Sequence, residues 1–392
     1  MKRLEFKSLI AIAFIFFSLM LYSCKETENV EPQSYSEILN LPNEPFNYSS
    51  IDFPDHFSET NIPIVPSTLD TDNTPSNNLV TDAGATLGRV LFYDKMLSKN
   101  NKVSCASCHV QEKGFSDPKV LSEGFEGGHT RRHSMGLTNA RFYQKGTFFW
   151  DERAATLEEQ VLLPIQDEVE MGMTLDSLVA RIEATDYYQP LFEDAFGDKT
   201  VTTDRVSKAL AQFVRSLVSY QSKYDIGRAV NRANQPFENF TEEENLGKIL
   251  FLEPIAVGGA GCLVCHGTEA FTTPPVSANN GLDAESTTDL GVYESTGRPN
   301  DIGKFKAPSL RNIALRAPFM HDGRFASLEE VIEHYNSGIQ AHPNLDRALQ
   351  YAEGNPIRMN LSQEEKNALV AFLKTLTDEE MIKDEKFSNP FR

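Results

Sequence analysis

The sequence is poor in positive charge. Its 392 residues include 37 Lys and Arg against 56 Asp and Glu, which gives a net charge of −19. An acidic surface of this kind repels the phosphate backbone, so we expect no nucleic acid partner. The charge is compatible with a basic or locally positive protein partner, but a surface that is simply solvated is the favoured interpretation.

The sequence also lacks any long hydrophobic run after Leu21. The run from Leu9 to Leu21 follows a basic start and is too short to span a bilayer, but it fits a signal peptide. It ends in Leu21-Tyr22-Ser23-Cys24, which resembles the lipobox of bacterial lipoproteins. We therefore predict a lipoprotein signal peptide over residues 1–23 and a lipid anchor on Cys24, at the periplasmic side or the cell envelope. An ordinary signal peptide followed by a chance cysteine is the alternative.

Residues 24–78 show neither helical nor strand periodicity. Asn, Ser, Thr, Pro and acidic residues dominate this segment, which predicts an acidic and polar tether. Ordered structure is expected to begin near Thr81. Two domains are predicted beyond it, over residues 79–240 and 241–380.

Strand signals are sparse, and several segments have helical periodicity, so we predict a mainly α fold with long loops. Residues 87–92 (LGRVLF) precede the first Cys-x-x-Cys-His group, and residues 246–251 (LGKILF) precede the second. This recurrence indicates a duplicated unit. Residues 241–244 and 327–330 have the pattern of a capping box, and the latter opens a helix with Tyr335 on its apolar face.

The few cysteines fall into a specific pattern. Apart from Cys24, they form two groups, Cys105-Ala-Ser-Cys108-His109 and Cys262-Leu-Val-Cys265-His266. Thiols at i and i+3 lie on one face of a helical turn, where both can add to the vinyl groups of a haem, and the next histidine can then ligate the iron. Disulfides or a zinc site are the alternatives, but zinc does not require the adjacent histidine twice over. We therefore predict two covalently attached haems c.

Further motifs lie between and after the two groups. They comprise residues 148–154 (FFWDERA), Gln160, Pro164, residues 166–171 (QDEVEM), residues 305–312 (FKAPSLRN) and residues 317–323 (APFMHDG). In combination they resemble the bacterial di-haem cytochrome c peroxidase and MauG family over about residues 79–376. The resemblance implies two tandem class I c-type cytochrome domains: an N-terminal peroxidatic haem domain and a C-terminal electron-transfer haem domain.

The resemblance also implies roles for individual residues. Glu170 matches the acid that moves a proton between the two peroxide oxygens, Gln160 matches a glutamine of the same pocket, and Trp150 matches a tryptophan between the haems. Trp150 is the single tryptophan of the chain. The alternative for Glu170 is a solvated charge. His109 and His266 would be the iron ligands on one side of each haem, and Tyr335 aligns with the second ligand of the C-terminal haem, with Met320 as its rival.

Three positions depart from the peroxidase pattern. Phe125 stands where many relatives have a removable histidine that blocks the N-terminal iron; His129 and His133 lie nearby and could substitute, or could be ordinary loop residues. Tyr335 stands where many peroxidases have a methionine, whereas MauG-type enzymes have tyrosine. A tyrosine that simply packs in the core is the alternative.

The third departure concerns an interdomain calcium ion. The family often binds calcium through an Asn side chain and two backbone carbonyls. Here His133 occupies the Asn position, with Arg316 and Pro318 at the carbonyl positions. This replacement puts calcium in doubt, and calcium stays open as a cofactor beside the two haems.

The sequence thus predicts an enzyme that reduces hydrogen peroxide to water with electrons from a small c-type cytochrome or similar donor. Two alternatives stay open. One is MauG-like oxidation of side chains of a partner protein, and the other is a non-catalytic di-haem electron carrier. Glu170, Gln160 and Trp150 together disfavour the carrier.

Overall fold

The computed structural model describes residues 37–60, 65–272, 277–352 and 355–392. The predicted signal peptide and Cys24 lie outside these ranges. Within them the fold is mainly helical with long loops, as expected, and its strands form only two short antiparallel pairs, β1 (Ser277–Ala278) with β2 (Phe305–Lys306) and β3 (Gln350–Ala352) with β4 (Asn355–Pro356). No helix of the described residues has the length and apolar character needed to cross a membrane.

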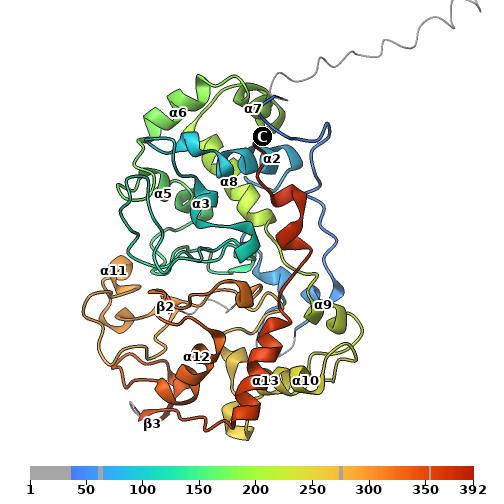
Figure 1. The fold of residues 1–392 in the computed structure, drawn as a ribbon, viewed down its shortest axis with the longest axis vertical. Helices are drawn as coiled ribbons and strands as arrows, with labels where there is room; N and C mark the ends of the chain where they lie inside the picture. Colours follow the sequence, from blue (N-terminus) through green and yellow to red (C-terminus); the bar gives the residue numbers. More distant parts are fainter. Residues whose placement is uncertain (1–36, 61–64, 273–276, 353–354) are drawn as a thin grey trace, which may run out of the picture.

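The molecule has two halves stacked along its long axis (Figure 1). The N-terminal half contains α2 (Asp82–Tyr93), α3 (Cys105–Cys108), α4 (Leu157–Gln160), α5 (Leu163–Gln166), α6 (Leu175–Glu183), α7 (Tyr188–Phe196) and α8 (Thr203–Ser216). The C-terminal half contains α9 (Lys223–Arg228), α10 (Glu242–Leu252), α11 (Tyr293–Thr296), α12 (Leu328–Glu333) and α13 (Gln363–Lys374). Each half has its own buried apolar cluster.

The two halves repeat one helix–helix contact. Helix α2 packs on α8, and α10 packs on α13. Gly88 and Gly247, the glycines of the repeated sequence, lie at these crossings: a Cβ would come within 2.0 Å of the Ala209 carbonyl oxygen in the first and 1.8 Å of the Ala368 carbonyl oxygen in the second. Only glycine permits so close an approach of two backbones. The repeated sequence therefore makes an equivalent helix contact in each half.

The helix caps agree only partly with the sequence. The box at Thr241 and Glu244 is present at α10. At α12, Ser327 accepts the Glu330 N–H, but the Glu330 carboxylate accepts from Ala326 instead of the cap residue. Helix α12 ends at Glu333, and Tyr335 lies in the π-helical turn His334–Gly338 that follows.

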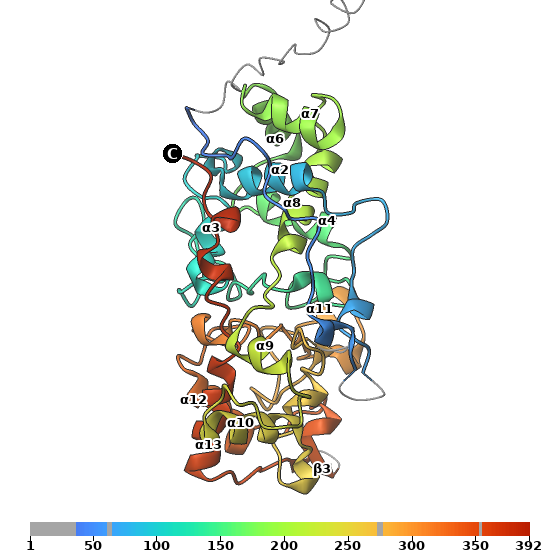
Figure 2. The ribbon, with the colours of Figure 1, turned by 90° about the vertical axis from the view of Figure 1, so that its right-hand side faces the viewer.

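Chain segments at both ends run along the outside of the two halves (Figures 1 and 2). Leu39 and Tyr48 are buried in the N-terminal cluster, and His56 Nε2 lies 3.0 Å from Asp225 Oδ1 in the C-terminal half. Order therefore begins well before Thr81, because this polar segment carries apolar residues too widely spaced to show a period. After α13 the chain returns to the N-terminal half, where Met381 and Phe387 are buried.

Candidate haem cavities

Both Cys-x-x-Cys-His groups lie at the edge of a cavity, and they come from equivalent places in the two halves. The larger cavity, about 530 Å³, is lined by Cys108 and His109. The smaller cavity, about 210 Å³, is lined by Cys262, Cys265 and His266. The first cysteine pair lies on helix α3. In the second pair, Cys262 begins a 3₁₀ turn (Cys262–Val264) and Cys265 directly follows it. All four thiols are free.

Both histidines are held in the same way. His109 Nδ1 lies 3.0 Å from the carbonyl oxygen of Phe115, and His266 Nδ1 lies 3.3 Å from that of Phe271. Each Phe has a left-handed φ, 58° and 52°, which turns its carbonyl toward the ring. Because Nδ1 is the donor in this bond, Nε2 is left as the available metal ligand. Burial lowers the pKa of both imidazoles, to about 4 for His266, and keeps them neutral.

These features fit a haem c better than the alternatives. The thiols of each pair are unbonded to one another. The described residues contain no group of three or more His, Cys, Asp or Glu side chains able to hold a metal ion, so no zinc site is formed there. The two carbonyl contacts have a signal in the sequence, because a Phe follows each histidine at a similar interval. The sequence alone did not indicate that the carbonyl groups of Phe115 and Phe271 orient the histidines.

Gln160 and Glu170 both line the larger cavity. Gln160 ends helix α4, which Glu158 fixes to α8 through an ion pair of 2.6 Å with the buried Arg215. Glu170 lies in the loop after α5, where Asp167 Oδ1 accepts the N–H groups of Val169 and Glu170 at 2.8 and 3.0 Å. The structure thus brings together the two pocket residues that the sequence analysis selected.

The environment of Glu170 changes its acidity. Burial, together with the charge of Asp167, raises the pKa of the Glu170 carboxyl to about 7, and the positive charge of Arg153 opposes this shift. A carboxyl with such a pKa can both accept and release a proton near neutral pH, which is what a shuttle between two oxygens requires.

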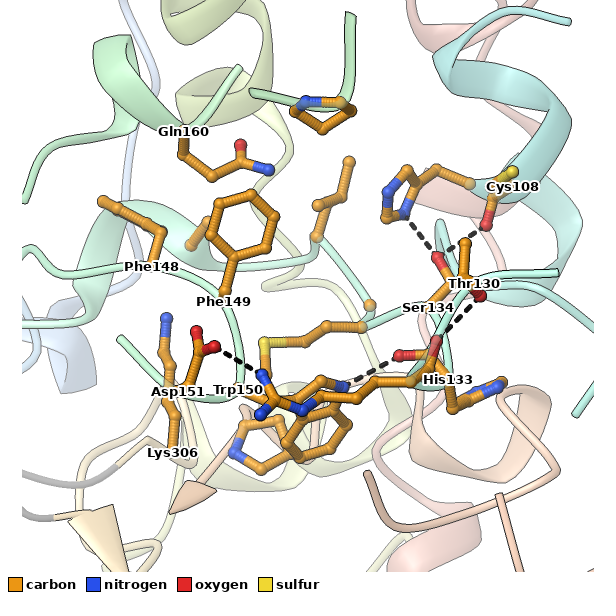
Figure 3. Close-up of a pocket in the computed structure, with 18 of the residues that line it drawn as sticks. Cys108, Thr130, His133, Ser134, Phe148, Phe149, Trp150, Asp151, Gln160 and Lys306 are labelled. Carbon is orange, nitrogen blue, oxygen red and sulfur yellow. Dashed lines mark hydrogen bonds and ion pairs between the residues drawn. The ribbon is translucent and has the colours of Figure 1, made fainter. Parts of the chain in front are cut away.

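Trp150 lines both cavities. Its indole Nε1–H donates to the carbonyl oxygen of His133 at 2.8 Å, and its own carbonyl accepts from the N–H of Lys306 at 2.9 Å. Figure 3 shows Gln160 on one side of the larger cavity and Trp150 on another, next to His133 and Lys306. The single tryptophan therefore lies where the two cavities meet.

An ion-pair cluster that the sequence analysis missed holds this region together. Arg132 contacts Asp151 at 2.5 Å in the N-terminal half, and Asp289 at 2.7 Å and Glu294 at 3.2 Å in the C-terminal half. Arg132 directly precedes the residue that binds the Trp150 indole. No local pattern in the sequence could identify Asp289 and Glu294 as partners, because they lie more than 150 residues after Arg132.

The three residues near the predicted blocking position are not equivalent. Phe125 is buried, its ring packs over Gly172, and it does not line the larger cavity. His133 is buried, with Nδ1 3.1 Å from the Lys119 carbonyl oxygen and Nε2 3.4 Å from the Ser116 hydroxyl. His129 is exposed at the edge of the cavity.

Tyr335 and Met320 both line the smaller cavity together with His266. The amide nitrogen of Asn280 lies 3.3 Å from the Tyr335 hydroxyl oxygen and 3.6 Å from the Met320 sulfur. The two candidate ligands therefore converge on one side chain, which sequence spacing could not reveal.

Comparison with known proteins agrees with this geometry. Residues 82–232 and 241–381 match the family model described as di-haem cytochrome c peroxidase. The methylamine utilization protein MauG of Methylophilus methylotrophus is 33% identical over 77% of this chain and 84% of its own length. The cytochrome c551 peroxidase of Nitrosomonas europaea is 32% identical over 76% and 80%.

A solved structure is similar as well. The crystal structure of a MauG-like protein associated with microbial copper homeostasis is 32% identical and superposes with a TM-score of 0.72, covering 87% of this chain and 99% of that one. Matches of this length and identity extend across both cavities. The chain belongs to the di-haem cytochrome c peroxidase family, and it is a haem peroxidase with two c-type haems.

Proposed function

We propose that this protein reduces hydrogen peroxide to water in the larger cavity, with electrons from a small c-type cytochrome or similar donor. One observation carries the proposal. The larger cavity brings His109, Gln160 and Glu170 together, and Trp150 connects it with the second cavity.

In this proposal the halves are two tandem class I c-type cytochrome domains, over residues 79–240 and 241–380. Cys105, Cys108 and His109 hold the N-terminal, peroxidatic haem. Cys262, Cys265 and His266 hold the C-terminal haem, where electrons enter. When bound, each haem would supply a redox-active iron, which His109 or His266 would hold. The repeated helix pairs and the two carbonyl-anchored histidines support this assignment.

Glu170 moves the proton. Its ionised carboxylate accepts the proton of one peroxide oxygen and transfers it to the other oxygen. The oxygen that receives the proton then leaves as water. Two electrons and two protons complete the conversion of one peroxide into two waters. Gln160, which carries both a donor and an acceptor, orients the peroxide by hydrogen bonding.

Trp150→Phe should slow electron transfer between the haems while peroxide binding stays intact. Phenylalanine keeps an aromatic ring but has no N–H for the His133 carbonyl, and it is harder to oxidise. The check is stopped-flow spectroscopy of the half-reduced protein after peroxide is added. An unchanged rate of oxidation of the C-terminal haem would show that electrons take another route.

Without a histidine at Phe125, the N-terminal haem should be five-coordinate and high-spin in the resting enzyme and react without prior reduction. The ring nitrogens of His133 are engaged elsewhere, and this supports the prediction. Electron paramagnetic resonance of the oxidised protein checks it. Two low-spin haems, with a high-spin signal restored by His129→Ala, would identify His129 as a blocking ligand instead.

MauG-like oxidation of a partner protein is the second candidate. The observation in its favour is Tyr335, whose hydroxyl lies in the smaller cavity beside Asn280. A phenolate ligand stabilises an oxidised iron, which suits the storage of oxidising equivalents.

We also propose that residues 1–23 are a lipoprotein signal peptide and that a lipid on Cys24 anchors the protein at the periplasmic side or the cell envelope. The apolar run and the Leu-Tyr-Ser-Cys sequence support this. Metabolic labelling with a fatty acid, lost in Cys24→Ala, tests it.

Steady-state turnover tests the proposed activity. The holoenzyme is mixed with a reduced small c-type cytochrome and hydrogen peroxide, and cytochrome oxidation is followed. We expect two cytochromes oxidised per peroxide, at a rate far above that without the protein. If peroxide causes no oxidation of the cytochrome but the enzyme oxidises side chains of a partner protein, the MauG-like function is favoured.

A further inference from the structure

Lys306 is a buried amine at the junction of the two cavities. It is 6% exposed and, like Trp150, it lines both the larger and the smaller cavity. It lies on strand β2, where successive side chains point to opposite faces. The preceding Phe305 lines the smaller cavity, whereas the Lys306 side chain extends toward Phe148 of the N-terminal half (Figure 3). The Lys306 N–H donates to the Trp150 carbonyl oxygen, so the amine adjoins the proposed electron route.

The amine is held by aromatic rings more than by polar groups. Nζ lies 3.8 Å from the centre of the Tyr143 ring and 4.6 Å from that of the Phe148 ring, and both residues line the larger cavity. The Thr147 carbonyl oxygen accepts from Nζ at 3.4 Å. Ring faces attract a cation, whereas burial disfavours it. The two effects oppose each other at this amine.

The groups around the amine set its charge. Burial lowers the pKa of Lys306 to about 7, the Glu152 carboxylate opposes this shift, and the positive charge of Lys145 adds to it. Glu152 is itself buried and accepts from the Tyr143 hydroxyl and the Lys145 ammonium. Lys145 is exposed, so these contacts lead from the solvent to the ring that Nζ contacts. The amine can therefore gain and lose a proton near neutral pH.

The proposed activity needs protons that Glu170 does not supply. Glu170 moves a proton from one peroxide oxygen to the other, whereas the conversion of one peroxide into two waters also consumes two protons with the two electrons. These protons must enter the larger cavity from outside the peroxide. An ammonium next to a site that receives electrons stabilises the reduced form, and the added negative charge in turn favours the ammonium.

We propose that Lys306 couples proton uptake to electron uptake: its amine takes a proton from solvent when the neighbouring haems are reduced, and the ammonium releases that proton to the larger cavity when peroxide is reduced. The N–H bond of the ammonium breaks, an O–H bond of product water forms, and the electrons come from the cytochrome donor. The release step rests on the proposed function. The uptake step does not, and it is measured without peroxide.

The first test follows the reduction potentials of the haems on both sides of pH 7. It uses the Glu170→Gln protein, because Glu170 titrates in the same range. In this protein the potential should fall as the pH rises through about 7, since the ammonium that stabilises the reduced form is lost. Adding Lys306→Met should remove the fall and keep the potential low. Lys306→Arg should keep it high, because a guanidinium stays charged.

Lys248→Met is the matched control. Lys248 is also buried, its Nζ lies 3.4 Å from the centre of the Phe237 ring, and burial lowers its pKa to about 8, but it lines neither cavity. Its replacement should leave the pH dependence of the potentials unchanged. The coupling is overturned if the potential falls as much with pH in the Lys306→Met protein, or if Lys248→Met abolishes the fall equally well.

Two neighbours cover the case in which Lys306→Met does not fold. Glu152→Gln removes a charge that favours the ammonium, so the fall in potential should move to lower pH. Lys145→Met removes a charge that disfavours the ammonium, so the fall should move to higher pH. Shifts in the same direction, or none, would contradict the assignment to Lys306.

Proton uptake closes the test. During electrochemical reduction of the unbuffered native protein near pH 7, an indicator dye should report more protons bound than in the Lys306→Met protein. Equal uptake in the two proteins, with normal peroxide turnover, would overturn the coupling and leave the proposed activity in place. Greater uptake in the native protein, without any peroxide turnover, would support the coupling and remove the proposed activity.

Discussion

Glu170→Gln should reduce peroxide turnover by about 10²–10⁴-fold, the usual effect of losing general acid–base assistance, with both haems still attached. Glutamine keeps the shape of the side chain but cannot accept and return a proton. The measurement is the steady-state rate with a reduced cytochrome, together with haem content by pyridine haemochrome. Glu168→Gln, an exposed change two residues away, should turn over normally and serves as the control.

The pH dependence gives an independent signature of the same carboxyl. Only its ionised form accepts the peroxide proton, so the rate of the peroxide reaction should rise with pH through about 7, the raised pKa of Glu170. Asp167→Asn removes a neighbouring negative charge that disfavours the ionised form. It should therefore move the inflection to lower pH, while its amide oxygen can still accept the two loop N–H groups. A Glu170→Gln enzyme that kept the same inflection would show that another group titrates.

The second large effect concerns the C-terminal haem. Tyr335→Phe should abolish the low-spin ferric signal of this haem and raise its reduction potential. A phenolate is a hard anionic ligand that stabilises ferric iron, so its loss favours the ferrous state. Potentiometric titration and electron paramagnetic resonance measure both changes. Asn280→Ala, which removes only the amide next to the Tyr335 hydroxyl, should shift the potential less and leave the signal in place.

The rival ligand makes this experiment decisive. If Tyr335→Phe leaves spectrum and potential as they are while Met320→Ala changes them, Met320 is the ligand. The haem would then be an ordinary His/Met centre, and the MauG-like alternative would lose its main support.

The repeat and the attachment motifs could be predicted from the sequence because their information is local. Leu-Gly-Arg and Leu-Gly-Lys recur at the same helix crossings, and each Cys-x-x-Cys-His group fits a single turn. Gln160 and Glu170 were selected through a family resemblance, and the structure brings them into one cavity. Helical periodicity alone would not have distinguished Glu170 from Asp167 and Glu168, the exposed acids that precede it in the same loop.

The remaining features depend on contacts between distant segments. Arg132 meets its partners in the other half, Asn280 approaches both candidate ligands, and Arg316 is enclosed by glycines some 180 and 200 residues away. The chain before Thr81 was expected to be a tether because its composition is polar. A few apolar side chains such as Leu39 and Tyr48 are nevertheless enough to hold it on the N-terminal half.

The most direct test of the proposed function is rapid mixing of the oxidised holoenzyme with hydrogen peroxide while the haem spectrum is followed. The haem spectrum should change on mixing, without prior reduction of the enzyme. When ferrocytochrome is added, the spectrum should return to that of the resting enzyme, and two ferrocytochrome molecules should be oxidised for each peroxide. The Glu170→Gln protein should lose this fast change and keep its resting spectrum. If peroxide leaves the haem spectrum unaltered in both the oxidised and the half-reduced enzyme, the larger cavity is not a peroxidase site.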